Sequence, residues 1–284
     1  MMNDSLNTVK KLTPPSLTAE HLSALKKTGI NVKGEGPAIV FLHSSLSSSK
    51  QWQPLISLLS DSFRCINIDL LGYGRAPLVS DPDNYTLATE LERIFIALEQ
   101  VIGDQPFHLV GHSFGGANAL KIAVENPKRI LSLSLYEPVA FHLLEKGTGV
   151  RARVLDFAET VASLDAASAA RHFTDMWNSK GFFDSLPKKM QTLMSNDIAK
   201  VNLDFVGLIS EQYGLPECQA VTCPVTLIHG SQSPDISREI IDRLANSFSN
   251  VVEYEIEAGH MAPISHAEQV ANIINDEIRG GDTF

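Results

Sequence analysis

The chain has 284 residues, of which 44% are hydrophobic and 20% are charged. This length and composition are typical of a globular protein with a full hydrophobic core, and they exclude a disordered, collagen-like or coiled-coil chain. The formal net charge is −10 at pH 7 and no Lys/Arg cluster offsets it, so nucleic acid is not expected as a partner.

The sequence gives no sign of export, membrane insertion or metal binding. Residues 1–15 are polar, lack the apolar run of a signal peptide, and are expected to form a flexible N-terminal segment. No stretch approaches the roughly 20 apolar residues that span a bilayer. Cys65, Cys218 and Cys223 lack metal-ligand spacing and fit a reducing compartment. We therefore expect a cytoplasmic protein without a membrane span, a metal site or a cofactor.

Short β-branched runs alternate with helix-like segments along most of the chain. The runs are almost continuously apolar, as expected for parallel strands that are buried on both faces. In chain order, the predicted elements are a helix at 18–27, strands at 30–33, 38–43 and 64–70, a helix at 86–102, a strand at 107–111, a helix at 116–125, strands at 130–136 and 225–229, a helix at 237–247 and a strand at 251–256. This alternation predicts an α/β fold with a mostly parallel central sheet flanked by helices.

The alternation is interrupted between residues 139 and 218, where the sequence is helix-rich and has no convincing strand. An Ala-rich run at 158–170 is followed by several aromatic residues. We predict that this stretch is a helical lid over the carboxyl edge of the sheet, with residues 16–138 and 219–284 forming the core. An ordinary peripheral helical domain is the alternative.

Ser113 lies in a Gly-x-Ser-x-Gly motif between a predicted strand and a predicted helix. Gly111 and Gly115 occupy the two positions where such a tight turn leaves no room for a side chain. The turn exposes the serine hydroxyl at a helix N-terminus, where free N–H groups and a partial positive charge favour an anion. We predict that Ser113 is a nucleophile, and a simple strand–turn–helix junction is the alternative.

A serine hydroxyl needs a base to take its proton. His260 is the candidate, because it directly follows the last predicted strand and Gly259 lets the chain turn toward the sheet edge. The order, with the serine first and the histidine far downstream, also favours this role. A loop histidine at the surface is the alternative.

The oxyanion that forms during attack needs fixed hydrogen-bond donors. One is expected to be the backbone N–H of Phe114, directly after the nucleophile. The second is assigned to the N–H of Ser45, in a Ser-rich loop that could otherwise be an ordinary turn. An apolar substrate pocket is expected from Leu46, Trp177, Phe182 and Met261.

Together these motifs resemble those of the α/β-hydrolase superfamily, from about Gly34 to Ile278. The matching parts are the His43 loop followed by Trp52, Asp69-x-x-Gly72-x-Gly74, the elbow at Ser113, and Gly259-His260. The resemblance implies an eight-stranded, mostly parallel sheet and a Ser–His–acid triad, with Asp69 shaping a loop. The segment before Gly34 predicts only a helix and one strand, so the family's first hairpin is expected to be reduced.

The position of the acid stays open. In the family it usually lies three residues after the Gly that ends the strand at 225–229, and here that position is Ser233. Asp235, two residues further on, is one candidate. Glu137, at the end of the strand at 130–136, is the preferred one, because a carboxylate at the end of a buried strand is costly unless it is paired. The carboxylate that is not the acid is expected to pair with a lid cation or to cap the helix at 237–247.

The predicted function is that of a carboxylesterase-type serine hydrolase that cleaves a small to medium, largely apolar ester through an acyl-enzyme. The same site could instead hydrolyse a β-diketone-type C–C bond, a lactone or an amide, or transfer an acyl group, and the fold does not choose among these. A small-molecule receptor with weak turnover is a third hypothesis, supported by the unusual acid position. The expected partner is a small-molecule substrate, and the sequence leaves open whether the protein forms a homodimer.

Overall fold

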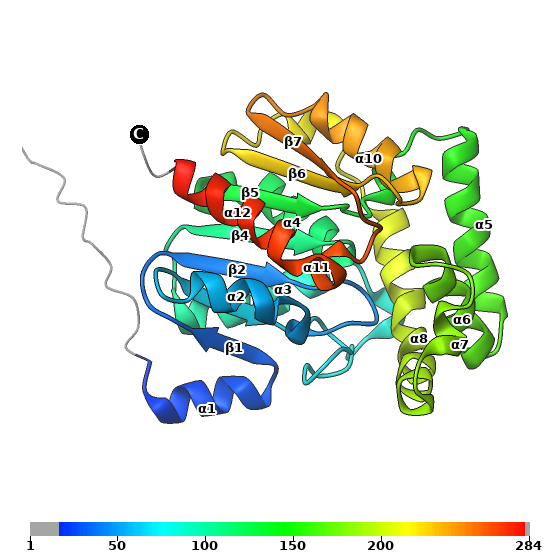
Figure 1. The fold of residues 1–284 in the computed structure, drawn as a ribbon, viewed down its shortest axis with the longest axis horizontal. Coiled ribbons are helices and arrows are strands. Elements are labelled where there is room, and N and C mark those ends of the chain that lie inside the picture. The colour runs from blue at the N-terminus through cyan, green and yellow to red at the C-terminus, as the bar shows by residue number, and fades with distance from the viewer. Residues whose placement is uncertain (1–16, 282–284) are drawn as a thin grey trace, which may run out of the picture.

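A single sheet of seven strands runs through residues 17–281, the part of the chain that the computed structural model describes (Figure 1). The strand order is β1-β3-β2-β4-β5-β6-β7, and every neighbouring pair is parallel except β1 and β3. The strands are β1 (Ile30–Lys33), β2 (Ala38–Leu42), β3 (Arg64–Ile68), β4 (Phe107–His112), β5 (Ile130–Tyr136), β6 (Val225–Gly230) and β7 (Val251–Ile256). The mostly parallel sheet predicted from the sequence is therefore confirmed.

The number of strands differs from the eight that the family resemblance implied. Before β1 the chain forms helix α1 (Ala19–Lys27), whose N-terminus is capped by the Thr18 hydroxyl, which accepts a hydrogen bond from the His21 N–H (3.2 Å). Because this segment is a capped helix, it cannot supply the partner strand of a hairpin, and β1 alone forms that edge of the sheet. The flexible segment expected at residues 1–15 lies outside the described residues.

Helices cover both faces of the sheet, because consecutive strand residues point to opposite faces. In β2, Val40 and Leu42 belong to the apolar cluster that includes α3, α4 and α10, whereas Ile39 and Phe41 belong to the cluster that includes α2 and α12. These helices are α2 (Gln53–Leu59), α3 (Leu87–Val101), α4 (Phe114–Glu125), α10 (Asp235–Ala245) and α12 (Ala267–Gly281). Strand β7 was expected to be buried on both faces, but it forms the other edge of the sheet and is largely exposed or half-buried.

The chain between β5 and β6 is helical, as the sequence predicted for this stretch, and we call residues 139–218 the helical insertion. Its helices are α5 (Gly149–Ser163), α6 (Ala166–Trp177), α7 (Phe182–Ser185), α8 (Lys188–Ser210) and α9 (Leu215–Cys218), preceded by a 3₁₀ turn at Phe141–Leu143. Helices α5 to α8 gather beyond the carboxyl ends of the parallel strands (Figure 1). In parallel α/β sheets this is the edge where ligands bind.

Shorter elements complete the described part of the chain. They are helix α11 (Ala262–Ser265) and 3₁₀ turns at Ser49–Trp52, Pro82–Asn84 and Pro127–Arg129. Among the helices of residues 17–281, none combines the length and the apolar character that crossing a membrane requires.

Candidate active site

Ser113 occupies a strained turn between β4 and α4. Its backbone angles are φ 55° and ψ −118°, a conformation that costs a non-glycine residue about 1–3 kcal/mol. The turn is closely packed, since a Cβ on Gly111 would lie 2.6 Å from the Gly115 oxygen, and one on Gly115 would lie 2.4 Å from the Leu42 oxygen. The Ser113 N–H donates a hydrogen bond to the Tyr136 oxygen (3.0 Å). The Gly-x-Ser-x-Gly motif thus forms a strand–turn–helix junction of the kind that can hold a serine nucleophile.

Glu137 and His260 form a buried pair, with exposed fractions of 0% and 2%. The Glu137 Oε2 accepts a hydrogen bond from the His260 Nδ1 (2.6 Å), and Oε1 accepts one from the Gly230 N–H at the end of β6 (2.7 Å). Burial alone would raise the pKa of Glu137, but the hydrogen bond and charge of His260 and the Gly230 N–H outweigh burial and lower this pKa. Because an ionised carboxylate only accepts hydrogen bonds, the His260 proton lies on Nδ1, and Nε2 remains as the proton acceptor.

Backbone strain is concentrated at this site. Within residues 17–281, the non-glycine residues with positive φ are Leu46 (53°), Ser113 (55°) and Glu137 (40°). They lie in the loop after β2, in the turn after β4 and at the end of β5. Strained residues persist only where their surroundings hold them, and such residues cluster at active sites. The Glu137 N–H still pairs with the Ile228 oxygen of β6 (3.0 Å), which fixes the carboxylate beside the end of that strand.

The other candidate acid lies at the surface. Asp235 is the first residue of α10, its side chain is 73% exposed, and it pairs with Arg153 of α5. Ser233, where the family usually has its acid, is partly buried and contributes to the lowered pKa of Glu137. The structure therefore brings Glu137, and not Asp235, into contact with His260.

Two further side chains hold His260 in place. His112 donates a hydrogen bond from Nε2 to the His260 carbonyl oxygen (2.8 Å), and burial, together with the nearby His260, keeps the pKa of His112 well below its ordinary value. The Trp177 ring lies 4.4 Å from the His260 ring, centroid to centroid. Sequence reasoning did not single out His112, although its place inside the elbow motif was a usable signal.

The two residues predicted to supply oxyanion donors both lie near Ser113. Phe114 is the first residue of α4, so its N–H has no partner inside the helix. Ser45 lies in the loop after β2 and lines the same pocket as Ser113. Among the described residues, neither N–H donates a hydrogen bond to a backbone carbonyl oxygen. Their role as oxyanion donors stays a prediction.

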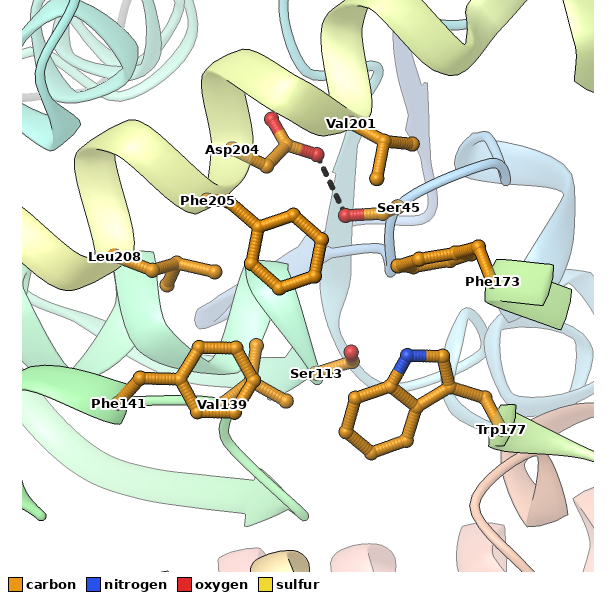
Figure 2. Close-up of a pocket in the computed structure, with 10 residues that line it drawn as sticks. All are labelled: Ser45, Ser113, Val139, Phe141, Phe173, Trp177, Val201, Asp204, Phe205 and Leu208. Carbon is orange, nitrogen blue, oxygen red and sulfur yellow. Dashed lines mark hydrogen bonds between the residues drawn. The ribbon is translucent and has the colours of Figure 1, made fainter. Parts of the chain in front are cut away.

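A cleft of about 850 Å³ opens at this edge of the sheet, and its walls include Ser113 and His260. The four residues predicted for a substrate pocket also line it: Leu46, Trp177, Phe182 and Met261. Figure 2 shows a smaller pocket beside Ser113, lined by apolar side chains that come mainly from the helical insertion: Val139, Phe141, Phe173, Trp177, Val201, Phe205 and Leu208. The free volume of this pocket is about 10 Å³, roughly the space of one water molecule.

A sequence model of the alpha/beta hydrolase fold matches residues 37–267. The chain belongs to the α/β-hydrolase family. A 3-oxoadipate enol-lactonase from Acinetobacter baylyi is 24% identical to this hydrolase over 88% of the chain and 91% of the relative. A pimeloyl-[acyl-carrier protein] methyl ester esterase from Methylococcus capsulatus is 28% identical over 88% of the chain and 97% of the relative. The crystal structure of the enol-lactonase from Burkholderia xenovorans LB400 has a TM-score of 0.71 at 19% identity, covering 88% of this chain and 95% of that chain.

This α/β-hydrolase also contains a buried charged cluster that sequence reasoning missed. Lys200 of α8 lies between Glu90 of α3 (3.1 Å) and Asp204 of α8. Asp204 accepts a hydrogen bond from the Ser45 hydroxyl (2.6 Å; Figure 2). A usable signal was a lysine and an aspartate four residues apart in the helix-rich stretch 139–218, at positions that share a helix face with apolar residues, where unpaired charges are not expected.

Proposed function

We propose that this α/β-hydrolase is a carboxylesterase-type serine hydrolase that cleaves small to medium, largely apolar esters through an acyl-enzyme. The observation that carries the proposal is the buried hydrogen bond between Glu137 and His260, in a cleft that also contains the strained Ser113. Two ionisable groups buried together are costly unless they are paired and hydrogen-bonded. This pairing keeps the imidazole in the tautomer that can accept a serine proton.

In the first half-reaction, His260 Nε2 takes the proton of the Ser113 hydroxyl while the serine oxygen attacks the ester carbonyl carbon. The negative charge that develops on the carbonyl oxygen is stabilised by the N–H groups of Ser45 and Phe114. Glu137 stays ionised and stabilises the imidazolium. His260 then donates its proton to the leaving oxygen as the ester C–O bond breaks, so the alcohol departs and the acyl group stays on Ser113.

In the second half-reaction, a water molecule attacks the acyl carbonyl and His260 takes its proton. The same two N–H groups stabilise the second oxyanion. When the tetrahedral intermediate collapses, the bond to Ser113 breaks and the serine oxygen recovers its proton from His260. One water is consumed for each ester, and the products are a carboxylic acid and an alcohol.

The walls around Ser113 support a compact apolar substrate. Aromatic and aliphatic side chains of the helical insertion leave about 10 Å³ of free space there, so a bulky acyl group fits only if these walls move. We propose on this basis that residues 139–218 act as a lid. The larger cleft, of about 850 Å³, offers room for the rest of the substrate.

Lactone opening is the second candidate, because a relative that matches most of the chain is a 3-oxoadipate enol-lactonase. Another relative is a methyl ester esterase, and both names denote cleavage of an ester bond. In a lactone the leaving oxygen stays attached to the acyl group, so the same steps give one ring-opened acid.

The test is hydrolysis of p-nitrophenyl esters of increasing acyl length and of a series of γ-lactones, by the wild type and by Ser113→Ala. Ser163→Ala on the exposed end of α5 serves as the matched control. We expect cleavage of short esters, a decline with acyl length, and loss of turnover to near the uncatalysed level in Ser113→Ala alone. Turnover of Ser113→Ala at the wild-type rate would refute the proposal, and cleavage of lactones without cleavage of esters would favour the second candidate.

A further inference from the structure

A buried charged cluster lies against both residues whose N–H groups form the proposed oxyanion hole. It consists of Glu90, Lys200 and Asp204, with exposed fractions of 0%, 6% and 2%. Replacing a buried charged cluster by apolar residues often leaves the free energy of unfolding unchanged or even raises it. Stabilisation of the fold is therefore a poor explanation for this cluster. The cluster joins a core helix, α3, to a helix of the insertion, α8.

The Glu90 carboxylate is fully used inside the protein. Its Oε1 accepts a hydrogen bond from the Tyr85 hydroxyl (2.8 Å) and lies 3.1 Å from the Lys200 ammonium. Its Oε2 accepts a hydrogen bond from the Leu71 N–H (3.0 Å). Glu90 therefore anchors Lys200 and offers no free acceptor to a substrate.

The Asp204 carboxylate is used in the same way. One oxygen pairs with Lys200, and the other accepts hydrogen bonds from the Tyr73 hydroxyl and the Ser45 hydroxyl, both at 2.6 Å. Although Asp204 lines the small pocket beside Ser113 (Figure 2), its oxygens already have protein partners. Asp204 thus acts on the site through its neighbours and not by direct contact with a substrate.

Lys200 contacts the second oxyanion residue. Its Nζ lies 4.6 Å from the centroid of the Phe114 ring, within the range of a cation–π interaction. The chain makes room for this lysine at Gly72, where a Cβ would lie 3.0 Å from the Lys200 Cγ. The cluster therefore touches Ser45 through Asp204 and Phe114 through Lys200.

The loop that carries Ser45 needs contacts such as the hydrogen bond to Asp204 to keep its conformation. The next residue, Leu46, has a φ of 53°, a conformation that non-glycine residues keep only when the surroundings hold it. On one side, the Ser44 hydroxyl donates to the Gln51 side-chain oxygen (2.9 Å). On the other side, the Ser45 hydroxyl is bound to Asp204. Loss of the second attachment leaves the direction of the Ser45 N–H less constrained.

We propose that Asp204, held by Lys200 and Glu90, is a positioning residue for the reaction. Its hydrogen bond to the Ser45 hydroxyl fixes the Ser45 N–H at the oxyanion site, so helix α8 of the insertion supports part of the transition-state binding. This inference rests on the proposed ester hydrolysis.

The most direct test is Ser45→Ala, which removes the hydroxyl and keeps the backbone N–H, compared with Ser45→Thr, which keeps a hydroxyl. Removing an oxyanion donor altogether reduces kcat by roughly 10²–10³-fold, so misplacing one is expected to reduce kcat by about 10–100-fold. KM should change little, because the contact is made in the transition state. The affinity of an alkylboronic acid, which forms a tetrahedral adduct with Ser113, should fall by a similar factor. Ser45→Thr should retain most of both quantities.

The link to Asp204 is tested by Asp204→Ala and by the double variant with Ser45→Ala. If Asp204 acts through Ser45, the double variant should be no slower than Asp204→Ala alone. Asp184→Asn, which breaks the exposed pair with Arg171 on the insertion, is the control for a general loss of charge there. If Asp204→Ala does not fold, the two Ser45 variants decide the matter alone.

Two results would overturn the inference. If Ser45→Ala keeps the wild-type kcat and boronate affinity, the hydrogen bond between Ser45 and Asp204 has no role in the reaction. If the losses of kcat in the two single variants multiply in the double variant, Asp204 does not act through Ser45. Failure of the proposed function is distinct, because it shows as turnover in Ser113→Ala. A wild type that neither cleaves esters nor binds boronate refutes both.

Discussion

Replacing Glu137 by glutamine changes one buried atom at the point where the proposed triad is held together. The glutamine oxygen can still accept the Gly230 N–H, which donates at 2.7 Å in the wild type. The amide NH₂ then faces His260 Nδ1 across a gap of 2.6 Å. Because two donors cannot share that gap, His260 has to carry its proton on Nε2. In that tautomer the ring cannot take the proton of Ser113.

The expected loss is large because neither partner is exposed to solvent, so screening does not weaken the interaction. The equivalent acid-to-amide change in a serine protease lowers kcat by about 10⁴-fold. This factor corresponds to about 5 kcal/mol of transition-state free energy. The free energy of unfolding should fall much less, by about 1.5–3 kcal/mol, because a single charge-assisted hydrogen bond is lost.

The assay is kcat for a short p-nitrophenyl ester, with the thermal midpoint of unfolding as a check on folding. Asp235→Asn makes the same chemical change at an exposed pair with Arg153, so its kcat should stay close to that of the wild type. The reasoning fails if Glu137→Gln keeps more than about a tenth of wild-type kcat, which is three factors of ten above the expectation. It also fails if Asp235→Asn shows the larger loss.

Three further predictions follow from neighbouring contacts. Adding Ser233→Asp to Glu137→Gln should restore part of kcat, because the Ser233 N–H donates to the Gly230 carbonyl oxygen (3.1 Å) and the Gly230 N–H donates to Glu137 (2.7 Å), so residue 233 lies close to this carboxylate. A kcat no higher than that of Glu137→Gln contradicts this. Burial lowers the pKa of His142 from 6.5 to about 4, so between these pH values the unfolded chain binds more protons and stability falls with decreasing pH, by about 2 kcal/mol at pH 5. His142→Phe keeps the ring contact with Tyr213 and should flatten this part of the curve of unfolding midpoint against pH; an unchanged curve argues against the assignment. Phe205→Leu should widen the small pocket and move the preferred p-nitrophenyl ester to a longer acyl chain; an unchanged preference would show that Phe205 does not limit acyl length.

Local patterns predicted much of the fold. The strands at 130–136 and 251–256 have the predicted bounds in the structure, and Ser113 lies in the predicted turn. These features depend on neighbouring residues, namely apolar runs and glycines two positions away from a serine. The count of eight strands came from the resemblance and differs from the seven found among residues 17–281, whereas the helix before β1 was predicted from the sequence itself.

The spacing of residues along the chain could not decide which carboxylate pairs with His260, and it could not reveal the charged cluster of Glu90, Lys200 and Asp204. Glu137 follows β5 and His260 follows β7, and the strand order β5-β6-β7 brings these two strand ends close enough for a hydrogen bond. This order cannot be read from the distance between the two residues along the chain. Glu90 and Asp204 come from helices far apart in sequence and meet only after the insertion packs on the core. A buried charge in a helical stripe can be noticed in the sequence, but its partner cannot be named there.

The way the chain enters the helical insertion limits how a substrate can be admitted. Pro138 directly follows Glu137, and the Val139 N–H donates a hydrogen bond to the Ser113 carbonyl oxygen (3.3 Å). The first residues of the insertion are therefore tied to both Ser113 and Glu137. A rigid swing of the whole insertion would break these ties in every cycle. If the insertion acts as the proposed lid, a hinge that leaves the site intact has to lie beyond residue 139. Helix α8 then has to stay with the core as well, because its Asp204 and Lys200 bind Ser45 and Glu90.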